Sequence, residues 1–316
     1  MTVITKYAYD PELVAAAVEL PKPESSSVQA ARAQLADMMS QFPAPDTAGV
    51  TITDHLVPGP DGAPDVPVRI YRPDSQPAPV GILDAHAGRF ILGGIEVSHA
   101  GNVAMARGVG AVVVSVDYRL APEHPFPAGL EDCYAALSWF SAHAAEFGVD
   151  PERIAIHGES AGGGLCAGLA LLARDRGGPS IAFQYLAFPQ LDDRLRTPSM
   201  TAFVDTPLWD RPAAIQSWDA YLGAGHSGTD DVPCYAAPAR ATDLSRLPPA
   251  YISAKEFDPL RDEDIAYATA LIAAGVPVEL HLFPGTFHGS AVIASAEVSR
   301  RETTERIAVL RKALGA

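Results

Sequence analysis

The sequence predicts an α/β fold in which a mostly parallel sheet carries helices on both faces. Three observations predict it: apolar runs of strand length recur along the chain, helical segments alternate with them, and a serine flanked by glycines stands at one junction between the two. Strands that are apolar throughout are typical of a sheet that is buried on both faces. We expect one domain over residues 1–316.

The composition indicates a globular chain with a core large enough to enclose a cavity. Apolar residues make up 48% of the 316 residues, and charged residues make up 19%. The formal net charge is −15 and no run of Lys or Arg occurs, so the chain offers no basic face to a phosphate backbone. We therefore expect a small molecule, and not a nucleic acid, as the partner.

The N-terminus and the cysteines favour a cytoplasmic location. The first ten residues lack a basic region followed by an apolar run, and we find no apolar stretch of about 18 residues that could span a membrane. Cys133, Cys166 and Cys234 are far apart and form no C-x-x-C pair, so we expect buried apolar thiols.

The first elements along the chain are helical and then antiparallel. Residues 10–42 carry apolar side chains at helical spacing, and Pro21 and Pro23 divide them into two pieces. Two β-rich runs between residues 50 and 73 then flank a turn at 59–62, which predicts an antiparallel hairpin. We expect the helices of residues 1–45 to form part of a cap over the sheet.

Alternating strands and helices follow the hairpin. The strand-like runs are VGILDAHAG (80–88), AVVVSVDYRL (111–120), RIAIHGES (153–160), IAFQYLAFP (181–189), AYISAKEFD (250–258) and VELHLFPG (278–285). Helical segments such as 129–148 and 261–275 lie between them, whereas residues 191–236 form a helical insertion that we expect to complete the cap. Four aromatic residues of this insertion suit either an apolar pocket or core packing: Phe203, Trp209, Trp218 and Tyr221.

Ser160 lies in a G-x-S-x-G pattern, Gly158 to Gly162, at the junction of a predicted strand and a predicted helix. In a nucleophile elbow the serine occupies a strained turn, so small neighbours let the backbone pass and leave the hydroxyl accessible. The alternative is a glycine-rich helix start that only aids packing or binds a phosphate, but no G-K-[ST] follows. We predict that Ser160 is a nucleophile.

A serine nucleophile needs a base within hydrogen-bond reach and a carboxylate that orients this base. With an elbow of this kind the partners follow in the order Ser, Asp or Glu, His, each after a later strand. Asp258 ends the strand-like run 250–258, and His288 follows the run 278–285, so both fit that order. They are the predicted acid and base.

Competing residues fit less well. His157 lies on the strand of the serine itself, where it cannot face the hydroxyl, so we expect it to be packed. Asp262 and Asp264 fall in a helix start, where carboxylates commonly serve as caps or interact with the helix dipole.

The oxyanion that forms during acyl transfer needs hydrogen-bond donors. The sequence DAHAGRF (84–90) follows the third predicted strand, where an oxyanion loop is expected. The donors of such a site are backbone NH groups, here those of Ala161, Gly88 and Arg89.

These motifs together resemble the hormone-sensitive-lipase-like branch of the α/β hydrolases, which contains bacterial esterases. Besides the elbow, VDYRLAPEHPFPAGLEDC (116–133), the run DPLRDED from Asp258 and FPGTFHG from Phe283 match segments of that family in order, over about residues 50–316. The resemblance implies an α/β-hydrolase fold with a helical cap and the same nucleophile, acid, base and NH donors. It implies no cofactor and no metal, and it leaves a homodimer open.

The chain departs from the family pattern at two positions. Glu159 stands where Asp is usual, which keeps the charge, and Arg89 stands where the HGGG motif has glycine. One interpretation turns the Arg89 guanidinium away and pairs it with a carboxylate. The other makes it a cation beside the acyl pocket that recruits a polar or acidic group of the substrate.

The expected activity is hydrolysis of carboxylic esters with small to medium acyl groups through an acyl-serine intermediate. The same machinery could act on an amide, a lactone, a carbamate or an acetylated sugar, because all pass through a tetrahedral oxyanion. A catalytically inactive small-molecule receptor is the alternative from another class, but a receptor has no need of the base His288.

Overall fold

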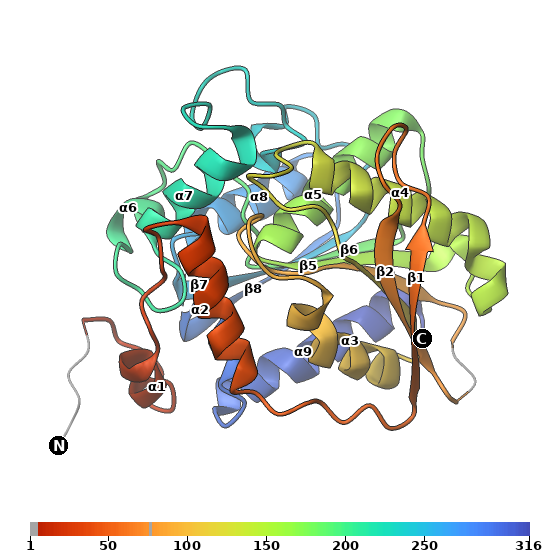
Figure 1. The fold of residues 1–316 in the computed structure, drawn as a ribbon, viewed down its shortest axis with the longest axis horizontal. Helices are drawn as coiled ribbons and strands as arrows, with labels where there is room; N and C mark the ends of the chain where they lie inside the picture. Colours follow the sequence, from red (N-terminus) through yellow and green to blue (C-terminus); the bar gives the residue numbers. More distant parts are fainter. Residues whose placement is uncertain (1–5, 76–77) are drawn as a thin grey trace.

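An eight-stranded sheet forms the centre of the computed structural model, which describes residues 6–75 and 78–316. The strand order is β1-β2-β4-β3-β5-β6-β7-β8 (Figure 1). The strands are β1 (Val50–Val57), β2 (Val66–Pro73), β3 (Gly81–Ala85), β4 (Val112–Val116), β5 (Ile154–Glu159), β6 (Phe183–Ala187), β7 (Ala250–Phe257) and β8 (Val278–Phe287). Strand β2 pairs antiparallel with β1 and β4, and all other pairs are parallel. The predicted hairpin and the mostly parallel sheet are confirmed.

Helices cover both faces of the sheet (Figure 1). One face carries α4 (Ala128–His143), α5 (Ala161–Arg176) and α8 (Arg261–Ala273), and the other carries α3 (Ile95–Val109) and α9 (Glu297–Leu314). Because side chains alternate along a strand, Leu83 of β3 enters the first core and Ile82 enters the second. Because both faces of the sheet are buried, the side chains on both sides of the parallel strands are mostly apolar.

The remaining helices lie in the left half of the molecule as Figure 1 shows it. They are α1 (Val14–Glu19), α2 (Val28–Ser40), α6 (Pro198–Ala202) and α7 (Arg211–Leu222). Side chains cap three of them at the N-terminus: Ser27 accepts from the NH of Ala30, Thr197 from that of Met200 and Asp210 from that of Ala213. Short 3₁₀ turns occur at Ala144–Phe147, Pro151–Arg153, Pro238–Arg240 and Ser290–Val292. Within the described ranges, no helix has both the length and the apolar character needed to cross a membrane.

The strand order decides where the predicted site residues meet. Strands β3, β5, β7 and β8 are parallel, so their carboxyl ends lie at the same edge of the sheet. The chain leaves β3 towards α3 on one face and leaves β5 towards α5 on the other. Ligands of open α/β sheets bind in the crevice at such a reversal.

Candidate active site

Ser160 occupies a strained turn between β5 and α5. Its φ of 55° and ψ of −119° place it in a conformation that non-glycine residues rarely adopt. A Cβ on Gly162 would lie 2.0 Å from the carbonyl oxygen of Ala85, and one on Gly158 would lie 2.3 Å from the carbonyl oxygen of Gly162. The glycines around the hydroxyl are therefore required by the close approach of the backbone, as a nucleophile elbow demands.

Asp258 and His288 follow β7 and β8 and form a buried pair. The Nδ1 of His288 lies 2.8 Å from Oδ2 of Asp258, and Oδ1 of Asp258 accepts a hydrogen bond from the NH of Leu260 at 2.9 Å. Asp258 is fully buried and His288 is 8% exposed. Because the carboxylate accepts the Nδ1 proton, Nε2 is the nitrogen that can accept a proton from a nucleophile.

The loop after β3 has an unusual backbone. Gly88, Arg89 and Phe90 all have positive φ, of 145°, 56° and 61°. A Cβ on Gly88 would lie 1.8 Å from the carbonyl oxygen of Leu92, so only glycine fits there. In the part of the chain that the structure describes, no oxygen accepts a hydrogen bond from the NH of Gly88 or Arg89. These two NH groups are thus free to bind an oxyanion.

Sequence reasoning missed several residues that hold this loop. The ring of Tyr118 stacks on that of His86 at 4.1 Å, and its hydroxyl donates to the His86 carbonyl at 2.8 Å. On the other side, the hydroxyl of Ser217 in α7 donates to the Arg89 carbonyl at 2.7 Å. Tyr118 lies in the 116–133 motif, which was the one available signal; nothing in the sequence marks Ser217.

A cavity of about 260 Å³ joins these elements. Ser160, His288, Gly88 and Arg89 line it together with apolar residues from three parts of the chain. The apolar lining residues are Leu20, Pro21, Ala31, Leu35, Met38, Met39 and Phe42 from the N-terminal region, Ala87, Leu92 and Phe188 from the sheet loops, Val97 from α3, and Leu208, Trp209 and Val292. An apolar cavity with a few convergent polar groups is the usual form of a small-molecule site.

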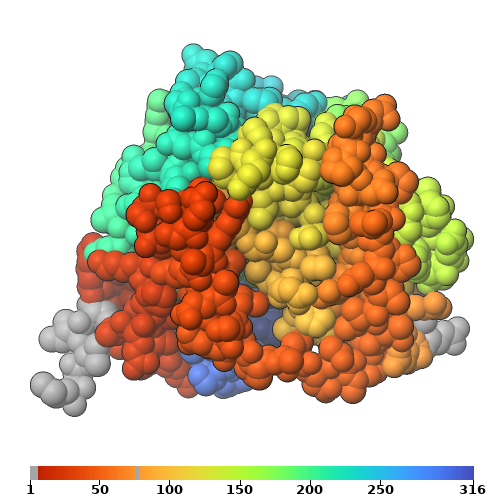
Figure 2. Space-filling view, viewed as in Figure 1, coloured from red at the N-terminus to blue at the C-terminus, as the bar shows by residue number. Residues whose placement is uncertain are grey.

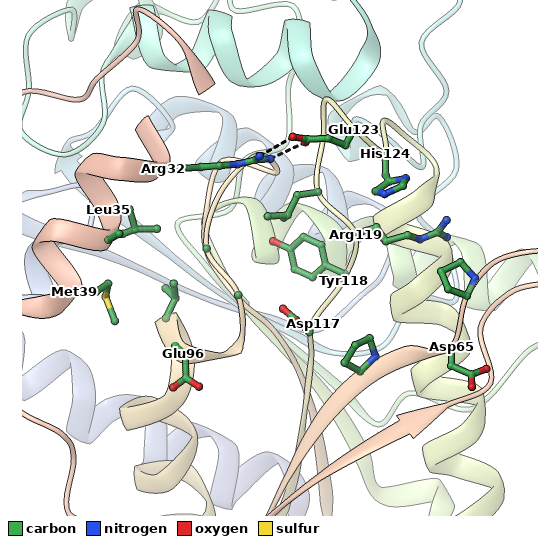
Figure 3. Close-up of a pocket in the computed structure, with 17 residues that line it drawn as sticks. Arg32, Leu35, Met39, Asp65, Glu96, Asp117, Tyr118, Arg119, Glu123 and His124 are labelled. Atoms are coloured by element: carbon green, nitrogen blue, oxygen red, sulfur yellow. Dashed lines mark hydrogen bonds and ion pairs between the residues drawn. The ribbon is translucent and has the colours of Figure 1, made fainter. Parts of the chain in front are cut away.

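A second, more open groove adjoins this cavity. Its volume is about 850 Å³, and it lies between α2, the loop from β1 to β2 and residues 117–124. In Figure 2, α2 and the hairpin stand on either side of it, and Figure 3 shows its lining residues. Leu35, Met39 and Val97 line both spaces, so the groove and the cavity of Ser160 meet at these side chains.

The Arg89 side chain combines features of both interpretations. Its Nη1 donates to the Glu24 carbonyl at 3.0 Å and its Nη2 to the Leu208 carbonyl at 3.1 Å, while the guanidinium lies 5.6 Å from the Trp209 ring. The expected carboxylate partner was wrong, because backbone carbonyls bind the guanidinium instead. Burial lowers the pKa of Arg89 to about 10, so the side chain remains a cation at neutral pH.

His157 is packed in the core, as expected. Its Nδ1 lies 2.8 Å from Oδ1 of Asp84, and its ring stacks on Tyr185. Asp84 also accepts from Asn102 at 2.9 Å and from Ser115 at 3.0 Å. This buried network joins β3, β4 and β5 to α3, and His157 does not line the cavity of Ser160, so it is not placed to act as the base.

Asp262 and Asp264 lie in the first turn of α8, the helix start that the sequence predicts, but neither is its N-cap, which is Leu260. Asp262 accepts from the NH of Ser199 in α6 at 2.7 Å and from Arg261 at 2.8 Å, so it joins α6 to α8. Asp264 is fully buried, and no partner of its oxygens is found among the described residues. Burial, aided by the charge of Glu263, holds the pKa of Asp264 well above its usual range.

Of the four aromatic residues in the insertion, only Trp209 lines the cavity, where its ring stacks on His288 at 5.4 Å. Phe203 packs on Tyr7, and Trp218 and Tyr221 pack on Phe90. Core packing therefore accounts for three of the four.

The expectation of buried thiols is confirmed for two of the three cysteines and was wrong for Cys234. Cys133 and Cys166 are buried, Cys234 is half-buried, and all three are free thiols. Burial raises the pKa of each thiol. Among residues 6–75 and 78–316, no group of three or more His, Cys, Asp or Glu is placed to hold a metal ion.

Comparison with known proteins identifies the family. A family model described as the alpha/beta hydrolase fold matches residues 82–292. Carboxylesterase NlhH of Mycobacterium tuberculosis is 42% identical over 299 residues, which cover 92% of this chain and 91% of the relative. Esterase LipI of the same species is 41% identical over 286 residues, covering 88% of this chain and 86% of the relative.

Solved structures agree with these relatives. A bacterial heroin esterase matches with a TM-score of 0.93 and 51% identity, over 97% of this chain and 98% of the other. Esterase LipW from Mycobacterium marinum matches with a TM-score of 0.86 and 36% identity, over 97% and 96% of the two chains. The chain therefore belongs to the α/β-hydrolase fold family, in the hormone-sensitive-lipase-like branch that its motifs resemble.

Proposed function

We propose that this α/β hydrolase cleaves carboxylic esters with small to medium acyl groups through an acyl-serine intermediate. Ser160 is the nucleophile, His288 the general base and Asp258 the carboxylate that orients it. The observation that carries the proposal is the buried pair of His288 and Asp258, 2.8 Å apart, in which His288 lines the same cavity as the strained Ser160. Relatives named carboxylesterase and esterase, at 41–42% identity, support the reaction class.

In the first half of the reaction, Oγ of Ser160 attacks the ester carbonyl carbon while Nε2 of His288 takes the serine proton. The carbonyl oxygen becomes an oxyanion, which the NH groups of Gly88, Arg89 and Ala161 stabilise. Asp258 stabilises the imidazolium. The tetrahedral intermediate then collapses, and the alcohol leaves with the proton that His288 returns to it.

In the second half, water replaces the alcohol. His288 removes a proton from water as the water oxygen attacks the acyl carbon, and the second tetrahedral intermediate then releases the carboxylic acid while His288 returns the proton to Oγ of Ser160. No step needs a group other than these side chains, the backbone NH donors and water.

The proposed cap consists of residues 1–45 and 191–236, of which residues 1–5 lie outside the described ranges. Its support is the lining of the cavity, to which α2 contributes Leu35 and Met38 and the loop before α7 contributes Leu208 and Trp209. Covering the site in this way excludes water and binds the apolar part of the substrate.

Rapid mixing with an activated aryl ester tests the function. We expect a burst of one equivalent of alcohol per chain and an acyl group on Ser160, whereas Ser160→Ala should lose several orders of magnitude in rate with an unchanged fold. Activity of Ser160→Ala within tenfold of wild type would contradict the assignment.

The homodimer and the cytoplasmic location stay predictions of the sequence. Light scattering after size exclusion measures the first, and cell fractionation measures the second.

A further inference from the structure

Two arginines link the N-terminal region to the oxyanion loop, residues 86–92, in opposite directions. Arg32 of α2 reaches to the loop, and its Nε donates to the Ile91 carbonyl at 2.7 Å. Arg89 of the loop reaches back, and its Nη1 donates to the Glu24 carbonyl at 3.0 Å. Both bonds join a charged donor to a backbone carbonyl, which is among the stronger kinds of hydrogen bond.

Neighbouring groups fix both arginines. Glu123 binds Arg32 with two bonds, of 2.7 Å to Nη1 and 2.8 Å to Nη2 (Figure 3). Arg32 also donates to the Ala121 carbonyl at 3.1 Å, and the NH of Ala121 donates to the Phe90 carbonyl at 3.0 Å. Arg32 therefore holds the oxyanion loop both directly and through the segment packed against it.

The loop needs such restraints because its backbone is strained. Arg89 and Phe90 have φ of 56° and 61°, and a non-glycine residue at positive φ costs on the order of 1–3 kcal/mol. Such conformations persist only where the surrounding structure imposes them. Here the bonds of Arg32 and Arg89, with the hydroxyl of Ser217 on the Arg89 carbonyl, supply that restraint.

We propose that Arg32 and Arg89 are positioning residues through which the docked N-terminal region holds the oxyanion NH groups in their working geometry. The inference rests on the proposed function. It gives the N-terminal region a part in the chemical step, in addition to covering the cavity. It also assigns the Arg89 guanidinium to structural bonds and not to recognition of an acidic substrate group.

The two roles predict different kinetics. A cap that only covers the cavity affects substrate binding, so its loss raises KM, most for long acyl chains. Displaced oxyanion donors instead lower kcat for every ester, because the oxyanion is common to all of them. Comparing the change in kcat with the change in KM therefore shows whether an arginine positions the oxyanion NH groups or only helps to cover the cavity.

The test uses Arg32→Met and Arg89→Met in the full chain, with 4-nitrophenyl acetate and hexanoate as substrates. We expect kcat to fall about tenfold on both esters, which is less than the roughly 10²- to 10³-fold cost of removing one donor outright. An alkyl boronic acid, which forms a tetrahedral adduct with the serine, should bind more weakly by a similar factor. Arg32→Lys should recover part of kcat, because it keeps a cation near the Ile91 carbonyl.

Arg107→Met is the matched control. Arg107 of α3 also donates to carbonyls of the N-terminal region, those of Asp46 at 3.0 Å and Ala48 at 2.5 Å, but these bonds lie outside the oxyanion loop. We expect its kcat to stay within twofold of wild type. Hydrogen exchange of residues 86–92 should speed up in the Arg32 and Arg89 variants and not in the control, and this measurement applies even to a variant with reduced stability.

An unchanged kcat with a KM that rises with chain length would overturn the proposal, as would equal losses in the Arg107 control. Those results leave the proposed function intact, since wild-type activity and its loss in Ser160→Ala are measured separately. Conversely, a wild type that cleaves neither ester would refute the proposed function, while hydrogen exchange would still report on the loop. A loss confined to an ester with a carboxylate in its acyl group would assign Arg89 to substrate recognition instead.

Discussion

Arg306 of α9 forms an ion pair with Glu159, the residue directly before Ser160, with 2.7 Å between Nη2 and Oε1. The side chains are 12% and 29% exposed, so the pair is largely shielded from water. It connects a helix on one face of the sheet to the turn that carries the nucleophile. The longer Glu in place of the usual Asp therefore has a defined partner.

Replacing Arg306 by Met should leave the Glu159 carboxylate without its partner beside the cavity. Loss of this partner from a partly exposed carboxylate should cost about 1–3 kcal/mol, and the loosened turn should also lower kcat. Urea unfolding and ester kinetics measure the two effects. Arg311→Met, at an exposed position of the same helix, should change stability by less than about 0.5 kcal/mol, and an equal loss there would remove the special role of the pair.

His288 and His157 should differ in how the same substitution affects activity. His288→Gln removes the proposed base and should reduce kcat/KM by several orders of magnitude, and it should also lower the free energy of unfolding because the buried Asp258 loses a partner. His157→Gln should keep most of the activity but lower the free energy of unfolding by about 1–3 kcal/mol, because the buried Asp84 loses a partner. Steady-state kinetics measures the loss of activity in each variant, and thermal unfolding measures the loss of stability. An inactive His157→Gln with an active His288→Gln would assign the base to His157.

Asp264 should make the protein less stable as the pH rises. Its pKa is raised in the folded state by burial first and by neighbouring charges second, so the folded chain keeps a proton that the unfolded chain releases. Stability from this group is complete below the unfolded pKa of about 3.9 and falls above it by about 1.4 kcal/mol per pH unit, until the folded pKa is reached. Asp264→Asn should flatten this slope in urea unfolding across the pH range.

Asp262→Asn is the control of opposite sign. Burial raises the pKa of Asp262, but hydrogen bonds from Arg261 and from the NH of Ser199 outweigh it and lower the pKa overall. Its contribution to stability is therefore present above the unfolded pKa and is lost as the pH falls. The substitution should destabilise the protein at neutral pH, and parallel behaviour of the two variants would refute both pKa directions.

Met38 should limit acyl-chain length. It lines the cavity of about 260 Å³ from α2, so Met38→Trp should fill space that a longer acyl group needs. We expect kcat/KM for 4-nitrophenyl hexanoate to fall at least tenfold, while the acetate changes less than threefold. Similar losses on both esters would place the acyl group elsewhere.

The fold and the three proposed catalytic side chains were accessible from the sequence because their signals are local. Apolar strands alternate with helices, the glycines around Ser160 form a recognisable pattern within five residues, and Asp258 and His288 each follow a strand in the expected order. The parallel sheet then brings the ends of these strands together.

The supporting contacts were not accessible because they join residues far apart in the chain. The Arg89 side chain binds carbonyls 65 residues before it and 119 residues after it, and a backbone carbonyl has no sequence signature. For the same reason the sequence offered a carboxylate as the partner of Arg89. Trp218 and Tyr221 carry aromatic rings that suit a pocket as well as a core, and only the position of Phe90 places them in the core.

The positions of the site residues along the chain decide the order in which a ribosome completes them. The elbow and the oxyanion loop belong to β5 and β3, which pair with each other near the middle of the sheet, whereas Asp258 and His288 follow the last two strands. A ribosome therefore completes the serine and its oxyanion donors while the acid and base are still untranslated. Nascent or prematurely terminated chains that end before residue 288 carry the nucleophile without its activating base, so they should leave cellular esters untouched.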